Sequence, residues 1–551
     1  MDPLLTPLAL AAVFICSALA LMPAARRRID LSRAKHGSLA GHARIAKRLA
    51  SLLPGYAYDD AAFFDSDGAP AAVAERRRAG FGCLAAEFAR RSPLTLAVTE
   101  QAREGLSDLQ FTSRYRVPFP YAALVRERLR LGGFVQASDG VQLEDLDGCR
   151  FVDLTGSYGV NLFGHAFYKA CMAEGLARTG ELGAVLGPLH PLVLANVERL
   201  KTISGLDEVS FHMSGTEAVM QAVRLSRYHT RRHHLVRFCG AYHGWWEDVQ
   251  PGPGNPLPPR ETYTLRDMDP RSLRVLRTRR DIACVLVNPL QALHPNAAAP
   301  ADSQLVDGSR RAHFDRAAYT AWLHELRAVC SERGIVLIFD EVFVGFRLAP
   351  GGAQQYFGVR ADIVTYGKTL GGGLPVGVVC GRHALMKRYR EERPADICFA
   401  RGTFNAHPVV MGAMSAFLDR LASPEVAAVY DGLDARWNAR AERLNLLLAG
   451  EDLPVRVANL STIWTVLYLQ PGRYHWMLQF YLRAQGLLLA WTGSGRMIFS
   501  LDHDEASFDA VAERFGAACR QMRADGWWWR DERVSAGAIR RSLLREMLRR
   551  L

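Results

Sequence analysis

Short β-rich apolar runs alternate with amphipathic helical stretches from about residue 190 to residue 415. The clearest runs are DIACVLVN, GIVLIFDEV, DIVTYG and PVGVVCG. This alternation predicts an α/β fold in which a mostly parallel sheet is covered by helices. Ligands of such sheets bind at the carboxyl ends of the strands, so the residues that follow these runs are the first candidates for chemistry.

Composition and charge exclude several classes of protein. Of the 551 residues, 49% are hydrophobic and 23% are charged, which is typical of a globular chain of two to four domains. The ten cysteines fall singly, so the sequence predicts neither a disulfide framework nor a metal site. The net charge of +12 is concentrated at the two ends of the chain, which argues against a nucleic-acid-binding surface.

The N-terminus carries an apolar run. No charged residue occurs from Pro3 to Ala25, and this run is long enough to cross a bilayer as a helix at about 1.5 Å per residue. Arg26, Arg27 and Arg28 follow it, so the positive-inside rule places the body of the protein in the cytoplasm. We therefore expect residues 1–28 to anchor the protein in the cytoplasmic membrane. The alternative is a hydrophobic arm docked on a soluble protein.

The C-terminal tail, residues 527–551, has the pattern of a basic amphipathic helix. Three tryptophans precede it, and five arginines lie opposite an apolar face. The apolar face comprises Ile539, Leu543, Leu544, Met547, Leu548 and Leu551. Such a tail suits a lipid interface, and it equally suits a helix packed on its own protein with a solvated arginine face.

Two other regions carry no chemical motif. Residues 29–130 are predicted to be helical, and no role can be inferred for them. At 135–154, short β-type runs separated by Asp-Gly turns predict a small antiparallel unit.

Four segments within the alternating region carry candidate chemistry. HMSGTEAVMQAVRLSR places Ser214, Gly215 and Thr216 at the start of a helix, where free N–H groups, hydroxyls and the helix dipole favour an anion; the alternative is an ordinary helix cap. Asp340 ends an apolar strand, and a carboxylate in that position requires a positive partner. Lys368 follows another strand and precedes three glycines, a setting that suits covalent amine chemistry. GAYHGWW offers Tyr242 as an aromatic face, with His243 beside it.

These parts together indicate one cofactor. Pyridoxal 5'-phosphate needs a phosphate cradle, an acid at its ring nitrogen, a stacking face and an amine that binds its aldehyde. The combination is much more specific than any one part, since each part alone has an ordinary structural interpretation.

The order SGTEA, YHG, DEVxxGFR, YGKxxGGGxPVG and GTF resembles the class III aminotransferases, which are fold-type I pyridoxal-phosphate enzymes, over roughly residues 130–520. Within that class, the segments around Lys368 and RGTFNAHP resemble glutamate-1-semialdehyde aminomutases and, more closely, the aminotransferase domains of polyketide and peptide synthases. The resemblance implies a large cofactor-binding domain at 191–415 and a smaller α+β domain formed by 131–190 and 416–526.

The resemblance also implies roles by matched position. Lys368 would hold the cofactor and shuttle a proton, and Asp340 would keep the ring nitrogen protonated. The other implied cofactor contacts are Ser214, Gly215 and Thr216 at the phosphate, Tyr242 and Val342 on the two ring faces, His243 beside Tyr242, Gln291 at the ring hydroxyl, and Thr403 at the phosphate of a neighbouring subunit. Ser157 and Tyr158 match the segment that lines the substrate pocket, and the shared phosphate site implies a homodimer.

One departure from the family pattern bears on the substrate. Asn288 stands where the family usually has a glutamate that, in several members, pairs with a carboxylate-gating arginine. Its absence puts amino-acid specificity of the common kind in doubt. The membrane-directed ends of the chain suggest a hydrophobic or carrier-bound substrate, so we expect an aminotransferase that transfers an amino group from a donor to such an aldehyde or ketone in secondary metabolism. The alternatives are a glutamate-1-semialdehyde-type 2,1-aminomutase and a catalytically silent membrane scaffold.

Overall fold

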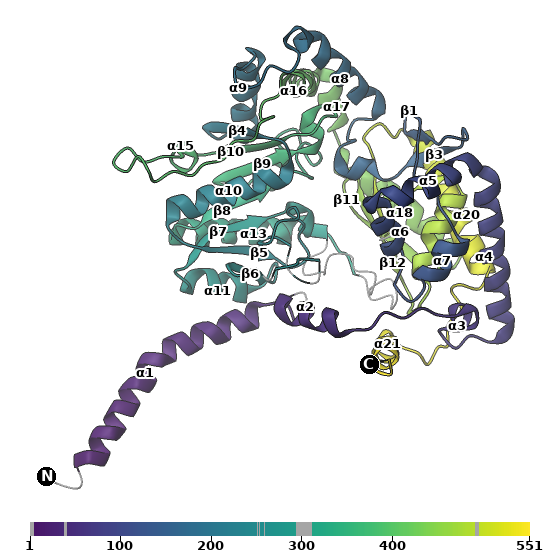
Figure 1. The fold of residues 1–551 in the computed structure, drawn as a ribbon, viewed down its shortest axis with the longest axis horizontal. Helices are drawn as coiled ribbons and strands as arrows, with labels where there is room; N and C mark the ends of the chain where they lie inside the picture. The colour runs from purple at the N-terminus through teal and green to yellow at the C-terminus, as the bar shows by residue number, and fades with distance from the viewer. Residues whose placement is uncertain are drawn as a thin grey trace.

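A seven-stranded sheet forms the centre of the large domain in the computed structural model, which describes residues 5–37, 41–250, 252, 254–257, 259–293, 311–490 and 495–550 (Figure 1). The strand order is β4-β10-β9-β8-β7-β5-β6, and every neighbouring pair is parallel except the two that involve β10. The predicted mostly parallel sheet is therefore confirmed. The strands are β4 (Glu208–His212), β5 (His234–Phe238), β6 (Thr262–Leu265), β7 (Ile282–Val287), β8 (Val336–Asp340), β9 (Ile363–Gly367) and β10 (Gly377–Gly381).

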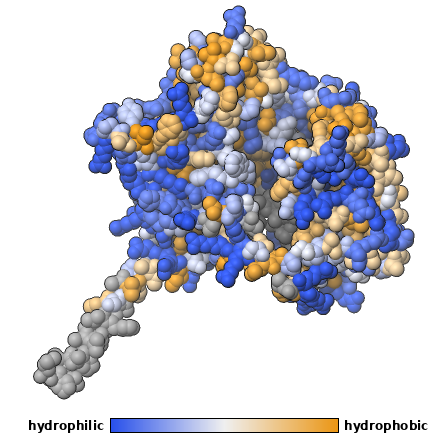
Figure 2. Space-filling view, in the orientation of Figure 1, coloured by the Kyte–Doolittle hydropathy of each residue, from blue (hydrophilic) through white to orange (hydrophobic). Residues whose placement is uncertain are grey.

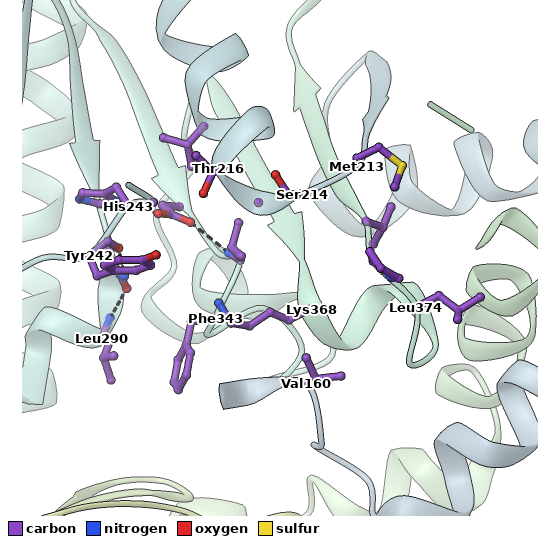
Figure 3. Close-up of a pocket in the computed structure, with 18 of the residues that line it drawn as sticks. Val160, Met213, Ser214, Thr216, Tyr242, His243, Leu290, Phe343, Lys368 and Leu374 are labelled. Carbon is purple, nitrogen blue, oxygen red and sulfur yellow. Dashed lines mark hydrogen bonds and ion pairs between the residues drawn. The ribbon is translucent and has the colours of Figure 1, made fainter. Parts of the chain in front are cut away.

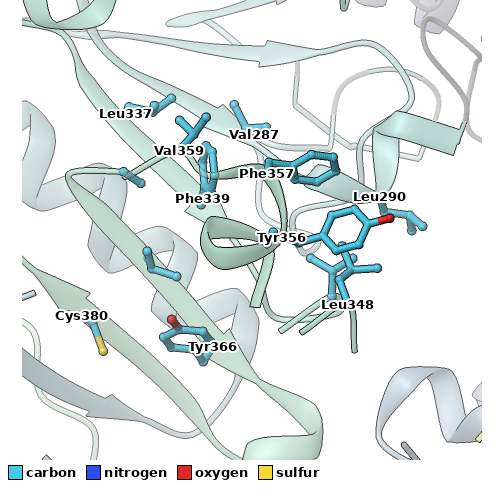
Figure 4. Close-up of a cluster of buried hydrophobic side chains, with 14 of the residues drawn as sticks. Val287, Leu290, Leu337, Phe339, Leu348, Tyr356, Phe357, Val359, Tyr366 and Cys380 are labelled. Atoms are coloured by element: carbon cyan, nitrogen blue, oxygen red, sulfur yellow. The ribbon is translucent and has the colours of Figure 1, made fainter. Parts of the chain in front are cut away.

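Helices cover both faces of this sheet, which explains why its strands are apolar along their whole length. In β7 all six residues are buried: Cys284 and Leu286 pack toward one face, and Val285 and Val287 toward the other. Figure 4 shows part of the second face, where Leu337 and Phe339 of β8 meet Tyr356 and Phe357. One face is covered by α10 (Gly215–Thr230) and α15 (His383–Met386); the other is covered by α8 (His165–Thr179), α9 (Leu192–Ser204), α11 (Pro270–Thr278), α13 (Arg316–Arg333), α14 (Gly352–Phe357) and α16 (Pro408–Leu421).

A second hydrophobic core belongs to the smaller domain. The antiparallel unit predicted at 135–154 is confirmed, and a strand from the C-terminal part of the chain joins it: Leu487 pairs in parallel with Val152. Two distant parts of the chain therefore build this domain together. Its elements are β1 (Ala137–Asp139), β2 (Gln142–Glu144), β3 (Arg150–Asp153) and β13 (Leu487–Leu488) in one sheet, β11 (Val455–Leu460), β12 (Ile463–Tyr468) and β14 (Arg496–Ile498) in another, and helices α17 (Pro424–Val429), α18 (Leu433–Gly450), α19 (Leu478–Ala484) and α20 (Glu505–Ala524).

The N-terminal helices share this second core. Phe63 contacts Trp476 with ring centroids 6.1 Å apart, and Arg77 is fully buried in an ion pair with Asp67 at 2.7 Å. Residues 58–131 therefore supply part of the packing of the smaller domain, a role that the sequence did not reveal. Helices α3 (Asp60–Asp65), α4 (Ala71–Arg91) and α7 (Ala122–Arg128) contribute to this core, whereas α2 (Ala43–Leu52), α5 (Pro93–Gly105) and α6 (Ser107–Tyr115) supply no described residue to it.

Helix α1 (Leu5–Ala34) extends away from the body, and only its C-terminal end contacts α11 (Figure 1). Ala34 is buried at this contact, and its carbonyl accepts a hydrogen bond from the N–H of Arg266 at 3.0 Å. The predicted anchor, residues 1–28, falls largely outside the described residues, because 1–4 and the side chains of 5–15 and 18–20 are not among them. Over the part of the chain that is described, no helix is both long and apolar enough to cross a bilayer.

The C-terminal tail packs in part on its own protein, through the loop that ends α20 and helix α21 (Ala536–Leu548). Trp527 and Trp528 are buried, and the Trp527 indole donates a hydrogen bond to Tyr481 at 2.7 Å. Ile539 is buried as well. The interpretation of Trp527 and Trp528 as part of an aromatic cluster at a lipid interface is therefore wrong, because both rings pack inside the core of the smaller domain.

Candidate active site

Six strands of the large sheet end at the same edge, where the antiparallel strand β10 begins, and the loops after five of them (β4, β5, β7, β8 and β9) reach one cavity. These loops enclose a cavity of about 400 Å³. In Figure 3, Tyr242 and His243 lie on one side of it, with Thr216 above and Lys368 and Phe343 below. The residues from these loops that line the cavity are Met213, Ser214, Gly215 and Thr216 after β4, Tyr242, His243 and Gly244 after β5, Asn288 and Leu290 after β7, Asp340, Val342 and Phe343 after β8, and Lys368 after β9.

Asp340 is the buried acid of this cavity. Its Oδ2 lies 2.7 Å from Nδ1 of His243, and its Oδ1 accepts a hydrogen bond from the N–H of Val342 at 3.1 Å. Burial lowers the pKa of His243 against the raising effect of the Asp340 carboxylate, and Arg237 adds to the lowering. A neutral imidazole donates its Nδ1–H to a carboxylate that can only accept. His243 therefore orients Asp340 while leaving its negative charge available to a cation in the cavity.

Lys368 reaches the same cavity from the neighbouring strand. Asp340 of β8 pairs with Thr365 of β9, so the two strands end side by side and bring the carboxylate and the amine to one place. Lys368 itself has a φ of +49°, a conformation that side-chain-bearing residues rarely adopt and that often marks functional sites. Burial lowers the pKa of its ammonium group, Asp340 opposes this effect and Arg347 adds to it. These conditions favour the neutral, nucleophilic amine.

The start of α10 forms an ordinary helix cap and also leaves backbone N–H groups that suit the predicted anion cradle. The Ser214 hydroxyl accepts from the N–H of Glu217 at 3.2 Å, and the Glu217 carboxylate accepts from the N–H of Met213 at 2.9 Å. No described residue accepts a hydrogen bond from the N–H of Gly215 or Thr216. These two N–H groups and the Thr216 hydroxyl are therefore available to an anion.

Close packing at Gly215 shapes the wall of the cavity. A Cβ at Gly215 would lie 2.5 Å from Cγ1 of Val342, so only glycine lets the first turn of α10 approach that side chain. On the other side, Asn288 donates a hydrogen bond to the carbonyl of Tyr242 at 3.0 Å and holds its loop. Val342 and Tyr242 both line the cavity, so an aliphatic and an aromatic side chain are available to the faces of a flat ring.

Four sequence-predicted residues lie apart from this group. Gln291 is buried and its Oε1 has no described hydrogen-bond partner, but it does not line the cavity. Thr403 is exposed and lies outside the cavity of its own chain. Ser157 and Tyr158, both at positive φ, are also not among the described lining residues, and their segment reaches the cavity through Val160 instead.

Sequence reasoning missed several lining residues, chiefly Phe343, Leu290 and Val160. The Lys368 Nζ lies 5.4 Å from the centroid of the Phe343 ring, and the guanidinium of the buried Arg347 lies 5.8 Å from the same centroid. Phe343 belongs to the DEVFVGFR motif, three residues after Asp340, so the motif could have indicated it as a candidate. The sequence does not show that its side chain faces the cavity, because that direction depends on the turn after β8.

The residues present fit pyridoxal phosphate. The available N–H groups of the cradle suit its phosphate, Asp340 suits its protonated ring nitrogen, and Val342 and Tyr242 suit the faces of its ring. Lys368 supplies the amine. The unpartnered buried Oε1 of Gln291 also leaves an acceptor in the loop after β7.

Comparison with known proteins gives a consistent result. The family model for class III aminotransferases matches residues 125–247 and 315–515. A glutamate-1-semialdehyde 2,1-aminomutase from Nitratidesulfovibrio vulgaris is 32% identical over 404 residues, which cover 69% of this chain and 90% of that protein. A transaminase solved with PLP bound superposes with a TM-score of 0.64 at 26% identity, covering 79% of this chain and 99% of its own. An omega-transaminase from Sphaerobacter thermophilus gives 0.63 at 25% identity, with 78% and 98% covered.

Proposed function

The chain belongs to the class III aminotransferases and is a transaminase that uses pyridoxal phosphate, and from this premise we propose that its acceptor is a hydrophobic or carrier-bound aldehyde or ketone. The observation that carries the proposal is the lining of the cavity. Among the described residues that line it, Lys368 is the only one with a lysine or arginine side chain. A substrate carboxylate would enter this apolar space without a positive partner from those residues, which is costly.

The apolar character of the lining supports the same substrate class. Phe343, Leu290, Leu374 and Val160 surround the space next to Lys368, and the neutral Asn288 takes the position of the usual acid. An alkyl or aryl chain would gain from burial against these side chains, at about 0.8 kcal/mol per methylene group.

Each group of the site then has a defined task. Bound pyridoxal phosphate supplies an electron sink that makes the proton on the amino-bearing carbon labile. Asp340 would keep that sink effective by pairing its carboxylate with the protonated ring nitrogen, and His243 orients the carboxylate for this contact. Lys368 holds the cofactor at rest and carries a proton on Nζ during the reaction. The first turn of α10 would bind the phosphate and so fix the position of the cofactor in the cavity.

A series of acceptors tests the substrate class. With full-length enzyme and one fixed amino donor, kcat/KM should rise roughly fourfold per added methylene along a series of straight-chain aldehydes, until the cavity is full. Adding a terminal carboxylate to the longest good substrate should reverse the gain. A flat series, or a preference for short keto acids, would contradict the proposal.

The similarity to a glutamate-1-semialdehyde 2,1-aminomutase keeps a second candidate open. An aminomutase would convert glutamate 1-semialdehyde alone, without any separate amino donor, whereas a transaminase requires one. The catalytically silent scaffold is disfavoured, because Lys368, Asp340 and the α10 cradle all face one cavity. A role in secondary metabolism remains our proposal, which neighbouring biosynthetic genes would support.

We also propose a homodimer. Thr403 and Phe404 of the GTF motif are exposed, and exposed apolar residues continue on α8 and α9, where Leu176 is 57% and Leu194 is 69% exposed. Figure 2 shows hydrophobic residues gathered over these helices at the top of the view. A second subunit would cover this surface and bring its Thr403 to the phosphate cradle.

Finally, we propose that the protein is attached to the cytoplasmic membrane with its catalytic body in the cytoplasm. The support is the uncharged run from Pro3 to Ala25 followed by Arg26, Arg27 and Arg28. A membrane position agrees with a hydrophobic acceptor, because such a substrate partitions into lipid.

A further inference from the structure

We propose that α2, the base of α1 and the outer side of α21 form one membrane-contact surface, here called the basal face, that seats the body of the protein on an anionic phospholipid bilayer. The inference rests on the proposed membrane attachment and extends it from the apolar run 3–25 to the folded body. The lipid surface covers the apolar side chains of this face and pairs with its arginines.

Helix α2 presents its apolar side outward. Ile45, Leu49 and Leu52 recur at a spacing of four and three residues, so they form one stripe, and they are 54%, 42% and 60% exposed. A surface helix of a globular protein normally turns such a stripe toward the core. In α2 only Ala46 is buried. The pattern of α2 is typical of a helix that packs its apolar side against a core, but these three side chains are exposed instead.

Arginines flank this stripe. Arg44 and Arg48 of α2 are exposed, and neither forms an ion pair with a described residue. A helix with leucines on one side and basic side chains at its flanks is the form that lies in the headgroup region of a bilayer.

Helix α21 presents the same combination on the same edge. Leu544 and Leu548, four residues apart, are 53% and 54% exposed, and the exposed Arg545 and Arg549 follow them. The segment just after α2 contacts this helix: the guanidinium of Arg550 lies 4.7 Å from the centroid of the Tyr56 ring.

A second contact joins the segment that follows α2 to α21. The Tyr58 hydroxyl donates to Glu546 at 2.5 Å, and the buried Arg473 also pairs with Glu546 at 2.7 Å. Figure 1 shows α2 and α21 along the lower edge of the molecule, and Figure 2 shows hydrophobic and hydrophilic residues side by side there.

The base of α1 adds positive charge to this edge. Arg26, Arg27 and Arg28 are exposed at the point where the apolar run ends. Where α1 meets α11, a groove of about 700 Å³ is lined by Arg266, Arg271 and Arg274 and by one carboxylate, Asp269, so its lining is positive on balance. Arg266 pairs with Asp269 at 3.5 Å and Arg274 with Asp30 at 4.0 Å. The groove is large enough for phosphate headgroups, and its charge is complementary to them.

The arginines of the basal face and the nearby apolar run 3–25 together favour a lipid bilayer as the partner of this face. A protein partner or a second copy of the chain could cover the leucines, but the arginines would then need acidic groups opposite them. An anionic bilayer meets both requirements, and it is the surface at which the run 3–25 would enter.

Hydrogen exchange of the full-length holoenzyme in lipid nanodiscs tests the basal face. We compare discs of phosphatidylcholine alone with discs that also contain phosphatidylglycerol. Exchange in peptides covering α2 and α21 should slow about tenfold in the anionic discs relative to the neutral ones, and high salt should remove the difference. A matched pair of variants separates the face from general hydrophobicity: Leu49→Gln with Leu52→Gln should abolish the slowing in α2. Leu94→Gln with Leu446→Gln, on α5 and α18, should leave it unchanged.

Other outcomes overturn the inference. Equal exchange in neutral and anionic discs would exclude lipid charge as the ligand, and protection that rises with protein concentration without lipid would assign the face to a second copy. Failure to associate with any disc would refute the membrane attachment as well. Cofactor absorbance and transamination, measured on the same samples, should be unchanged in the leucine variants. Absence of lipid-dependent protection in the wild type would therefore refute the basal face alone, and absence of transamination in the wild type would refute the proposed enzyme activity.

Discussion

The Nδ1 atom of His243 lies 2.7 Å from Oδ2 of Asp340, and both side chains are almost completely buried. Burial lowers the pKa of His243, so this contact is a hydrogen bond from a neutral ring and not a closed ion pair. The negative charge of Asp340 is therefore left for a cation that enters the cavity, and we propose that this cation is the protonated ring nitrogen of pyridoxal phosphate.

Asp340→Asn should retain the cofactor and lose activity. An amide keeps the shape of the carboxylate and can still accept from His243, but it cannot hold the ring nitrogen protonated. We expect kcat to fall about a hundredfold or more while bound cofactor, measured after protein denaturation, stays near one per chain. Near-normal turnover would contradict the role of Asp340 as the counter-charge.

Lys368→Ala should abolish covalent attachment of the cofactor. Borohydride treatment of the wild-type holoenzyme should fix pyridoxal phosphate to one lysine, which peptide mass mapping identifies. We expect that lysine to be Lys368, because it is the lysine among the described lining residues of the cavity. Labelling of another lysine, or a labelled Lys368→Ala protein, would refute the assignment.

Attachment should also occur at a lower pH than for an ordinary lysine. The attacking form is the neutral amine, and burial lowers the pKa of Lys368, so the neutral fraction rises at a pH below the usual lysine value. Apoenzyme treated with pyridoxal phosphate and borohydride from about pH 7 to about pH 10 should show its midpoint below that of a free lysine. Lys387 is an internal control: its hydrogen bond to Glu391 raises its pKa, so it should be labelled only at the alkaline end.

The alternation of apolar runs was sufficient to predict the large sheet, because every residue of β7 and β8 is buried between helices. It was not sufficient to predict the direction of β10, since PVGVVCG is as apolar as the parallel strands and the reversal depends on the turn before Gly377. The role of the N-terminal helices was also invisible. Phe64 packs near Trp527, and no local pattern relates two residues so far apart in sequence.

The sequence predicted correctly those site residues that come directly after a strand and line the cavity. Asp340 and Lys368 come at the ends of β8 and β9, so the fold class alone placed them together. The substrate side was not predictable in this way. Tyr158 is 53% exposed, and Val160 reaches the cavity in its place, because the backbone turns through positive φ at Ser157 and Tyr158.

Mixed dimers test the shared phosphate site. A Lys368→Ala chain and a Thr403→Ala chain are each expected to have low activity as homodimers. In a heterodimer both changes collect at one site and the other site is intact, so activity should recover toward half of the wild-type value. Tagged heterodimers purified away from both homodimers provide the measurement, and an inactive purified heterodimer would argue against a contribution of Thr403 to the partner.

The two ends of the chain should bind the membrane through different interactions: hydrophobic burial at the N-terminus and electrostatic attraction at the C-terminus. Burial of the apolar run 3–25 is not screened by salt, so full-length protein should stay in the membrane fraction at about 1 M salt, where the Debye length is about 3 Å. Deleting residues 1–28 removes that run but spares Ala34 and the contact of α1 with α11, so the fold should persist.

The shortened protein should still bind anionic membranes through arginines such as Arg44, Arg48 and Arg545, and high salt should release it. Deleting residues 536–551 as well should leave it weakly bound at low salt, with its cofactor still attached, because neither deletion touches the cavity. Fractionation at two salt concentrations measures both effects. Full-length protein recovered without detergent in the soluble fraction would refute the anchor, and the case for a substrate delivered from the membrane would then rest on the apolar cavity alone.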